Sequence, residues 1–234
     1  MAQAPQAITS GTTGEWPATA ERMGVRRAPA PTAAPSPAPR PTPPSVIGFY
    51  SDRPGRQWRE FSNFYRLPRP YEYTLPSFAR RQGLPDSIWC HFSEKAIMAT
   101  KAALMGDLEA FQAIDRAEDP RSVKALGRGV RNFDEALWQQ HLADVAFEVV
   151  RQKFEADPGC RRVLLSTGDS ILAEAAPNDA VWGIGLPLGD ERVQHPDQWC
   201  GRNALGYALM RARAHLRGEG AGPSAAAAAE PGGA

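Results

Sequence analysis

The chain has 234 residues, a formal net charge of +1 and an apolar fraction of 42%, which suits one globular domain with flanking segments. Because neither sign of charge dominates, the composition argues against a general nucleic-acid-binding or membrane-binding surface, which requires a basic excess. The first residues lack the apolar core of a secretory signal, and no run reaches the roughly 18 apolar residues of a membrane-spanning helix.

The three cysteines are widely separated and odd in number. Cys90, Cys160 and Cys200 show no spacing typical of metal ligands or of a disulfide framework. The sequence therefore predicts reduced thiols in a cytoplasmic protein.

Both ends of the chain have a composition that does not support a packed core. Residues 1–45 are rich in Ala, Pro, Thr and Ser, and residues 218–234 are rich in Gly and Ala. Such segments bury too little apolar surface to offset the entropy of ordering them. We expect two disordered tails around one domain at residues 46–217, and their simplest role is solubility or tethering.

Short apolar runs predict the strands of this domain. A strand is expected at Val46–Tyr50, a short one at Tyr71–Leu75 and another at Ile171–Ala175. The run Ile88–Phe92 is also short and apolar, whereas the rest of the stretch between Arg53 and Pro85 is irregular, aromatic and rich in proline.

Capping residues predict the helices. Ser93 is the expected N-cap of a helix from Glu94 to Met105, closed by Gly106. Each of the next four helices begins at an aspartate, twice with proline following it, and a last helix precedes the C-terminal tail. These helices are expected at residues 107–116, 119–127, 134–156, 157–165 and 203–216. Helices in series with few short strands predict a mainly helical, single-domain α+β fold with a small β-sheet.

The helix after Ser93 carries two charges on its apolar side. Glu94 and Lys101 lie seven residues apart, so they point nearly the same way, roughly 10.5 Å apart along the axis. That distance suits two groups lining one pocket. The alternative is a first-turn charge favoured by the helix dipole, with a lysine that extends to solvent.

Two further segments combine polar and aromatic residues. Asp179 is followed by Trp182 and Gly183, a combination typical of a loop that stacks a base and lets the backbone approach a ligand. Asn63 lies between two phenylalanines and is suited to orienting a hydroxyl or a carbonyl. The alternatives are a tight turn with a core tryptophan and a capped turn with two aromatic anchors.

Arg128 and Arg131, which follow Gly127, are candidates for phosphate binding, with an ordinary solvated basic loop as the alternative. Other familiar sites are missing from the sequence. The four histidines have no partner at metal-ligand spacing, and no Walker loop, dinucleotide fingerprint or nucleophile elbow is present. We therefore expect neither a metal nor a cofactor.

Taken in order, several short motifs of this chain resemble the YbiA-like family, whose domain is also called NADAR. The resemblance covers about residues 46–216. The matching motifs are Phe49-Tyr50, Phe61-Ser62-Asn63-Phe64, Trp89, Ser93-Glu94-Lys95-Ala96, Lys101, Leu126-Gly127-Arg128, Lys153-Phe154, Leu164-Leu165-Ser166-Thr167-Gly168, Glu174, Asp179, Trp182-Gly183-Ile184-Gly185, Asn203-Ala204-Leu205-Gly206, Leu209-Met210 and Arg213.

The resemblance implies an N-glycosidase that cleaves ribosylated aminopyrimidine intermediates of the riboflavin pathway and releases ribose 5-phosphate. It also implies two alternatives: an ADP-ribosyl hydrolase acting on ADP-ribosylated guanine, for which ADP-ribosylated nucleic acid is the partner, and a non-catalytic module that binds NAD or ADP-ribose. This chain departs from the family in Lys95-Ala96-Ile97-Met98, where His-Tyr-Phe-Gln is frequent, and in two longer stretches at residues 65–87 and 186–201.

A ribosyl C–N bond breaks through an oxocarbenium-like state, which requires a carboxylate near C1 and an oriented water molecule. Under this hypothesis Glu94 is the base or charge stabiliser and Asp179 the second carboxylate. Lys101 polarises the ring oxygen, protonates the leaving group or traps an opened sugar as an imine. The expected binding residues are Trp182 and Gly183 for the base, Asn63 and Asn203 for the ribose hydroxyls, and Arg128 for a phosphate.

Overall fold

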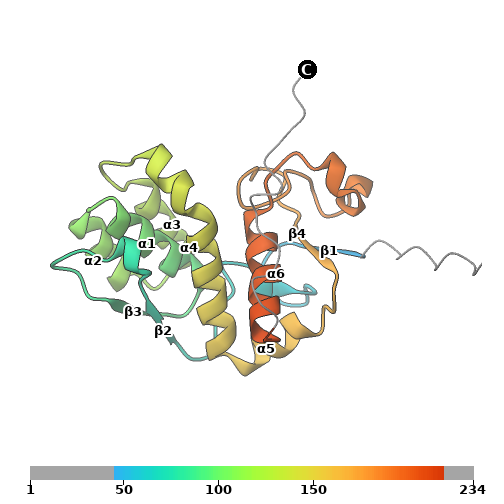
Figure 1. Cartoon of the computed structure of the whole chain (residues 1–234), viewed down its shortest axis with the longest axis horizontal. Helices are drawn as coiled ribbons and strands as arrows, with labels where there is room; N and C mark the ends of the chain where they lie inside the picture. The colour runs from blue at the N-terminus through green and yellow to red at the C-terminus, as the bar shows by residue number, and fades with distance from the viewer. Residues whose placement is uncertain (1–44, 219–234) are drawn as a thin grey trace, which may run out of the picture. The chain divides into compact units, whose positions relative to one another are not determined.

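The computed structural model describes residues 45–218 of the chain, so the predicted tails lie outside the described residues apart from Ser45 and Gly218. The fold is α+β and mainly helical, as the sequence predicts (Figure 1). Its helices are α1 (Ser93–Leu104), α2 (Leu108–Arg116), α3 (Pro120–Arg128), α4 (Glu135–Ala156), α5 (Pro158–Leu165) and α6 (Ala204–Leu216). Its strands are β1 (Val46–Phe49), β2 (Tyr71–Thr74), β3 (Ser87–Cys90) and β4 (Ile171–Glu174).

Helix α4 is the centre of the core. It packs against α6 on one side and α1 on another, so it lies between α6 and the group formed by α1, α2 and α3 (Figure 1). Its buried residues, which include Trp138, Leu142, Val149 and Phe154, occupy more than one helical face. A helix that is apolar on more than one face must be covered on several sides, which explains why the other helices surround it.

The predicted aspartate caps are confirmed. In α2, α3, α4 and α5 the side chain of the N-cap aspartate accepts a hydrogen bond from a backbone N–H of the first turn. The prediction of Ser93 as an N-cap is wrong, because α1 begins at Ser93 and Phe92 occupies the N-cap position without a side-chain cap. Instead, the N–H of Glu94 donates to the backbone carbonyl of Asn63, 2.9 Å away, so a distant loop satisfies this helix end.

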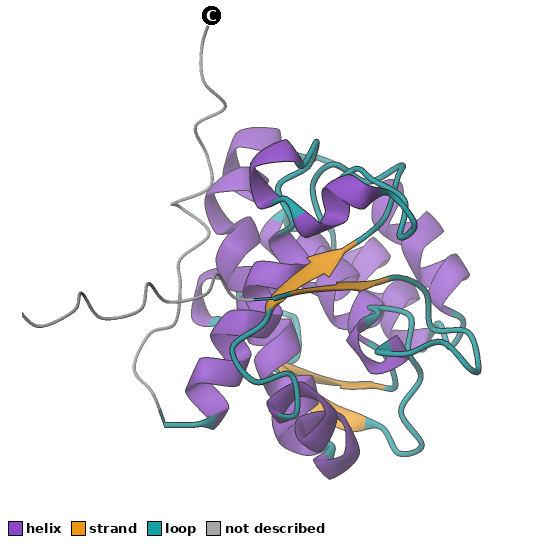
Figure 2. Ribbon diagram, turned by 90° about the vertical axis from the view of Figure 1, so that its right-hand side faces the viewer, coloured by secondary structure: helices purple, strands orange, loops and turns teal. Residues whose placement is uncertain are grey.

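The strands form two separate two-stranded sheets, which Figure 2 shows apart from each other. β2 and β3 are antiparallel, whereas β1 and β4 are parallel and pair Phe49 with Glu174. Paired residues of parallel neighbours project from the same face of the sheet. Phe49 packs edge-on against Phe61 in the main core, so Glu174 faces that side, while Ala173 joins a second apolar cluster with Ile184 and Val193.

Helix α3 approaches α1 closely at one glycine. A Cβ atom added to Gly127 would lie 1.9 Å from the sulfur of Met98. The Gly127 carbonyl also accepts a hydrogen bond of 3.0 Å from the Lys101 ammonium. Only a residue without a side chain fits this contact, so Gly127 sets the spacing of the two helices.

We expect Gly127→Ala to lower the free energy of unfolding by about 1–3 kcal/mol, because the new methyl group overpacks the contact with Met98. The loss should appear although alanine favours a helix more than glycine does. Urea unfolding measures the effect, and Met98→Ala in the same chain should reduce the cost.

Gly189→Ala is the matched control, since a Cβ at Gly189 meets no atom within 4 Å. It should change stability by no more than about 0.5 kcal/mol. A Gly127→Ala variant as stable as this control would contradict the packing argument.

Candidate functional site

Glu94 occupies the first turn of α1 and is 5% exposed. Its backbone is held by the carbonyl of Asn63. The segment that carries Asn63 is fixed in turn by Lys153 of α4, whose buried ammonium donates to the carbonyls of Glu60 at 2.8 Å and Ser62 at 3.0 Å. The position of Glu94 therefore depends on α4 as well as on its own helix.

Glu174 is the last residue of β4 and faces the same region. Its N–H donates to Oδ1 of Asn203 at 3.0 Å, and Nδ2 of Asn203 donates to the carbonyl of Leu172 at 2.8 Å. Within the described residues, the buried Oε2 atom of Glu174 has no hydrogen-bond partner. A buried carboxyl oxygen without a partner is unfavourable unless it is protonated or meets a ligand.

Asp179 follows in the loop after β4. Its Oδ1 atom accepts hydrogen bonds from the backbone N–H groups of Val181 at 3.0 Å and Trp182 at 2.8 Å. These bonds fix the turn that presents Trp182, a half-buried residue packed against the main core.

The carboxyl groups of Glu94, Glu174 and Asp179 are close enough to influence one another's charge. Burial raises the pKa of Glu94 from 4.5 to about 7; Lys124 and Arg128 act against this rise, and Asp179 adds to it. Burial raises the pKa of Glu174 to about 8, aided by Asp179 and Glu94 and opposed by Lys124. Raised carboxyl pKa values with identified neighbours are typical of functional sites.

The two cations of this site come from α3. Lys124 and Arg128 are spaced i, i+4 and flank Gly127, so all three share the face that packs against Met98 of α1. Met98 itself lies one turn after Glu94 on its own helix. Both cations are near enough to Glu94 for their charges to lower its pKa.

Comparisons with known proteins identify the family of this chain. The family model for the NADAR domain matches residues 49–217. The chain belongs to the NADAR domain family. It is 40% identical over 122 residues to N-glycosidase R617 of Acanthamoeba polyphaga mimivirus, covering 52% of this chain and 71% of that protein.

Other NADAR relatives match over more of the chain. N-glycosidase YbiA of Shigella boydii is 31% identical over 173 residues, covering 74% of this chain and 89% of the relative. The NMR structure of Escherichia coli YbiA superimposes with a TM-score of 0.56 at 28% identity, covering 76% of this chain and 88% of that one. The α+β fold predicted from the sequence is therefore similar to that of YbiA.

The remaining predicted site residues of this NADAR domain lie in different surroundings. The Lys101 ammonium binds the Gly127 carbonyl and lies 4.2 Å from the centroid of the Phe133 ring. Its partial burial lowers the pKa of Lys101. The fully buried Asn203 uses both ends of its amide on the backbone of β4, a geometry suited to holding Glu174 in place.

Gly183 has a packing role in this geometry, since an added Cβ would lie 2.8 Å from the carbonyl oxygen of Glu174. Arg131 lies outside the cluster and binds Asp107 and Glu109 at the start of α2. Asn63 is half-buried and next to Glu94 through its carbonyl. The structure thus brings Asn63, Arg128 and Asp179 near Glu94, and the hydrogen bond to Asp179 ties Trp182 to the same loop.

Sequence reasoning missed Lys124, and it noted Glu174 only as part of the family motif. The i, i+4 spacing of Lys124 and Arg128 was a usable signal, because it places two cations on one helical face. Glu174 gave no comparable signal, since its role depends on the pairing of β1 with β4.

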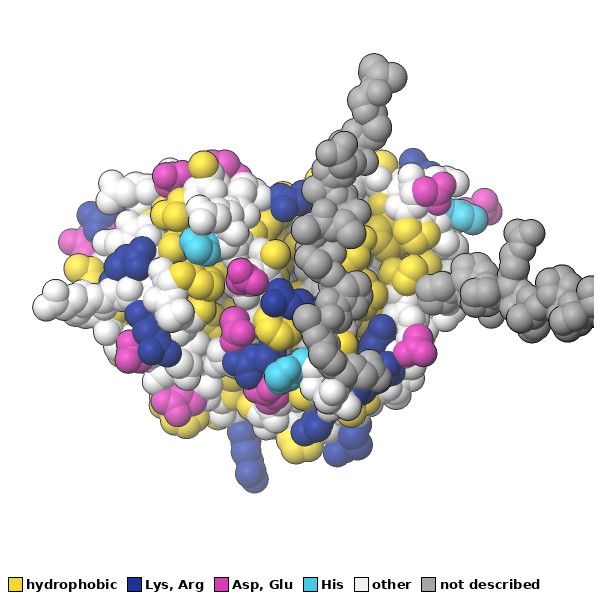
Figure 3. Space-filling model, in the orientation of Figure 1, with side chains coloured by type: hydrophobic (Ala, Val, Ile, Leu, Met, Phe, Trp, Pro, Cys, Tyr) yellow, Lys and Arg dark blue, Asp and Glu magenta, His cyan; other side chains and the backbone are white. Residues whose placement is uncertain are grey.

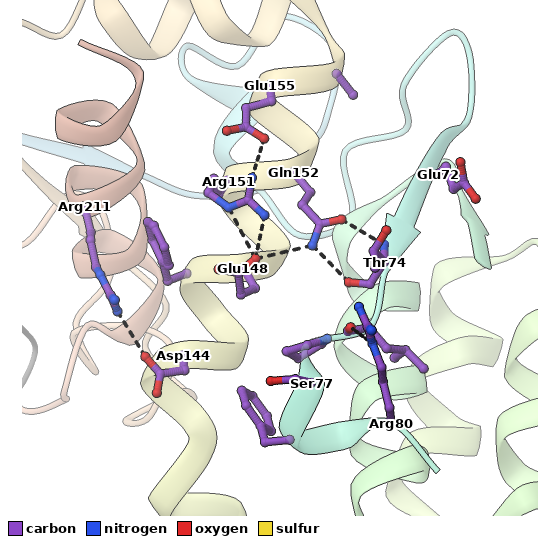
Figure 4. Close-up of a pocket in the computed structure, with 15 residues that line it drawn as sticks. Glu72, Thr74, Ser77, Arg80, Asp144, Glu148, Arg151, Gln152, Glu155 and Arg211 are labelled. Carbon is purple, nitrogen blue, oxygen red and sulfur yellow. Dashed lines mark hydrogen bonds and ion pairs between the residues drawn. The ribbon is translucent and has the colours of Figure 1, made fainter. Parts of the chain in front are cut away.

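A separate groove of about 870 Å³ lies between β2, α4 and α6 (Figure 4). Most of its charged side chains bind one another: Arg151 pairs with Glu148 and Glu155, and Arg211 pairs with Asp144. The site predictions name no residue of this groove, and its internal pairing leaves little charge for a ligand.

Three wider features of the described residues concern surface charge, metal ligands and membrane spans. On the described part of the face drawn in Figure 3, acidic and basic side chains are interspersed. Across residues 45–218, no set of three or more His, Cys, Asp or Glu residues is placed to bind a metal. Over the same residues, no helix has the length and apolar character needed to cross a membrane.

Protonation of Glu174 should make stability depend on pH. Its pKa in the folded chain, about 8, lies above its ordinary value of 4.5. Its contribution is therefore fully present below about pH 4.5 and is lost as the pH rises through 8. We expect the stability of Glu174→Gln, relative to the natural chain, to increase steadily from pH 5 to pH 8 in urea unfolding.

The exposed Glu191 offers a matched control, and Glu191→Gln should keep the pH dependence of the natural chain. If Glu174→Gln also retained that dependence, Glu174 would not titrate as a buried acid.

Proposed function

We propose that this NADAR domain is an N-glycosidase that hydrolyses the C–N bond between ribose and the base of ribosylated aminopyrimidine intermediates, releasing ribose 5-phosphate. The observation that carries the proposal is the pair of buried carboxyl groups, Glu94 and Glu174, with pKa values raised to about 7 and about 8. The family and its relatives named N-glycosidases support the enzyme class.

The two carboxyl groups divide the acid and base roles. Near neutral pH, Glu174 is mainly protonated and can donate its proton to the leaving nitrogen as the C1–N bond breaks. Glu94, which loses its proton more readily, stabilises the positive charge at C1 and accepts a proton from the attacking water, whose oxygen bonds to C1. Two carboxyl groups whose surroundings separate their pKa values are the usual basis of such a division.

The other residues of the site complete the proposal. Trp182 stacks on the base, and Asn63 lies beside Glu94 where ribose hydroxyls would be bound. Asp179 is a second anion near C1 and orders the Trp182 turn through two backbone hydrogen bonds. Arg128 binds the phosphate, while Asn203 and Gly183 hold the backbone of Glu174 and Lys101 fixes the end of α3.

The family resemblance points to riboflavin-pathway substrates, and one relative supports this. The riboflavin biosynthesis protein PYRR of Zea mays is 32% identical to this chain over 111 residues, although the match covers 16% of that protein. ADP-ribosylated guanine presents the same ribosyl C–N bond and is the competing substrate class.

Glu94→Gln should lower kcat for release of reducing sugar by more than about 100-fold, because glutamine neither accepts the water proton nor carries the charge that stabilises C1. Glu174→Gln should lower kcat comparably and remove the alkaline limb of the kcat–pH profile. Both variants should give circular dichroism spectra like that of the natural chain.

Glu191→Gln serves again as the control and should keep full activity. Turnover by a folded Glu94→Gln variant at more than about a tenth of the natural rate would refute the catalytic assignment.

A substrate panel separates the competing substrates. We expect the highest kcat/KM for ribosylaminopyrimidine 5′-phosphates and lower values for NAD and ADP-ribosylated DNA. Preferred cleavage of ADP-ribosylated guanine would replace the proposed substrate, and ADP-ribose binding in calorimetry without turnover of any substrate would indicate a binding module.

A further inference from the structure

Lys124 differs from the other three lysines of the chain in the contacts of its ammonium group. The ammonium of Lys95 lies near Asp115 and Glu118, that of Lys153 donates to two carbonyls, and that of Lys101 donates to Gly127. Lys124 is half-buried, and its ammonium lies 5.4 Å from the centroid of the Phe64 ring. Among residues 45–218 its ammonium makes no hydrogen bond, and no carboxylate oxygen lies within 4.0 Å of it.

Arg128, one turn further along α3, is in the same situation. It is exposed, and within the described part of the chain no carboxylate oxygen lies within 4.0 Å of its guanidinium. By contrast, Arg131, three residues later, binds both Asp107 and Glu109. The two cations on the Gly127 face are thus left without ion-pair partners where α3 meets α1.

The carboxyl groups nearby do not neutralise these cations. Glu174, with a pKa of about 8, is mainly protonated at neutral pH, and Glu94, with a pKa of about 7, is about half ionised. Because the partly protonated carboxyl groups do not balance the two positive charges, the site can bind an anion. A phosphate ester supplies such an anion and would lie beside the ribose that Glu94 acts on.

We propose that Lys124 and Arg128 together bind the phosphate on the substrate ribose, and that Lys124 makes the site prefer phosphorylated substrates. Residues spaced i, i+4 on a helix have Cβ atoms about 6 Å apart, which lets both side chains reach one phosphate. The arginine fork binds two phosphate oxygens, and the lysine acts as a point charge on the third. The inference rests on the proposed ribosyl substrate and adds a residue that selects among such substrates.

The test compares a ribosylaminopyrimidine 5′-phosphate with the same compound lacking the phosphate. We expect Lys124→Gln to lower kcat/KM for the phosphorylated substrate by about 10- to 100-fold, mainly through KM, since one charge-assisted hydrogen bond is lost. The unphosphorylated substrate should lose clearly less, because it loses only the effect of the Lys124 charge on Glu94 and Glu174. Arg128→Gln should behave alike, and Lys124→Arg should keep most of the preference.

Arg121→Gln is the matched control, because Arg121 is an exposed residue in the first turn of the same helix. It should leave both substrates unaffected. Equal losses on the two substrates in Lys124→Gln would overturn the proposal, since Lys124 would then act on the carboxyl groups. An unchanged preference for the phosphorylated substrate would overturn it as well.

A binding measurement separates this proposal from the proposed function. Calorimetry with ribose 5-phosphate should give binding to the natural chain that weakens at least tenfold in Lys124→Gln, and ADP-ribose shows whether a diphosphate is accepted too. If ribose 5-phosphate binds through Lys124 but no substrate is cleaved, the proposed function fails and the phosphate site stands. If substrates are cleaved without any preference for phosphate, the phosphate site fails and the function stands.

Discussion

The contact between Gly127 and Met98 is the constraint on which the candidate site depends. A Cβ atom at Gly127 would overlap the Met98 side chain, and a wider spacing of α3 and α1 that relieved the overlap would move Lys124 and Arg128 away from Glu94. The Lys101 ammonium reinforces the same contact from α1, since it binds a carbonyl in the last turn of α3, where the helix dipole favours a cation. One interface between two short helices thus supports both the packing and the charge distribution of the site.

The pairing of β1 with β4 supplies the other half of the site. The chain between these strands contains α1 to α5, so the pairing joins segments far apart in sequence. It places Glu174 on the face that also carries Phe49, and the Asn203 amide holds the end of β4 through two backbone hydrogen bonds. Asn203 adopts a left-handed backbone with φ of 51°, a conformation that asparagine tolerates better than most residues do.

Local features were predictable from the sequence, and long-range ones were not. The aspartate caps and following prolines define α2 to α5, because capping involves residues within one turn. The error at Ser93 has a tertiary cause, since the carbonyl of Asn63 satisfies the N–H of Glu94 from another segment. Glu94 was identified from its place on an apolar face, whereas the role of Glu174 requires the strand pairing and that of Lys124 requires the Gly127 contact.

Lys101 and Lys124 show that the role of a lysine at this interface depends more on where its side chain extends than on its position along the helix. Lys101 lies on the same face of α1 as Glu94, yet its flexible side chain extends along α3 to the Gly127 carbonyl and the Phe133 ring. Lys124 lies on the opposing helix, and its charge acts on both Glu94 and Glu174. Because Lys101 is already bound to protein groups, a negatively charged ligand entering the site would meet Lys124 without first breaking a hydrogen bond. Helical periodicity identified the face of α1 that carries Glu94. The cation that is available to a ligand, Lys124, comes from the opposing helix α3.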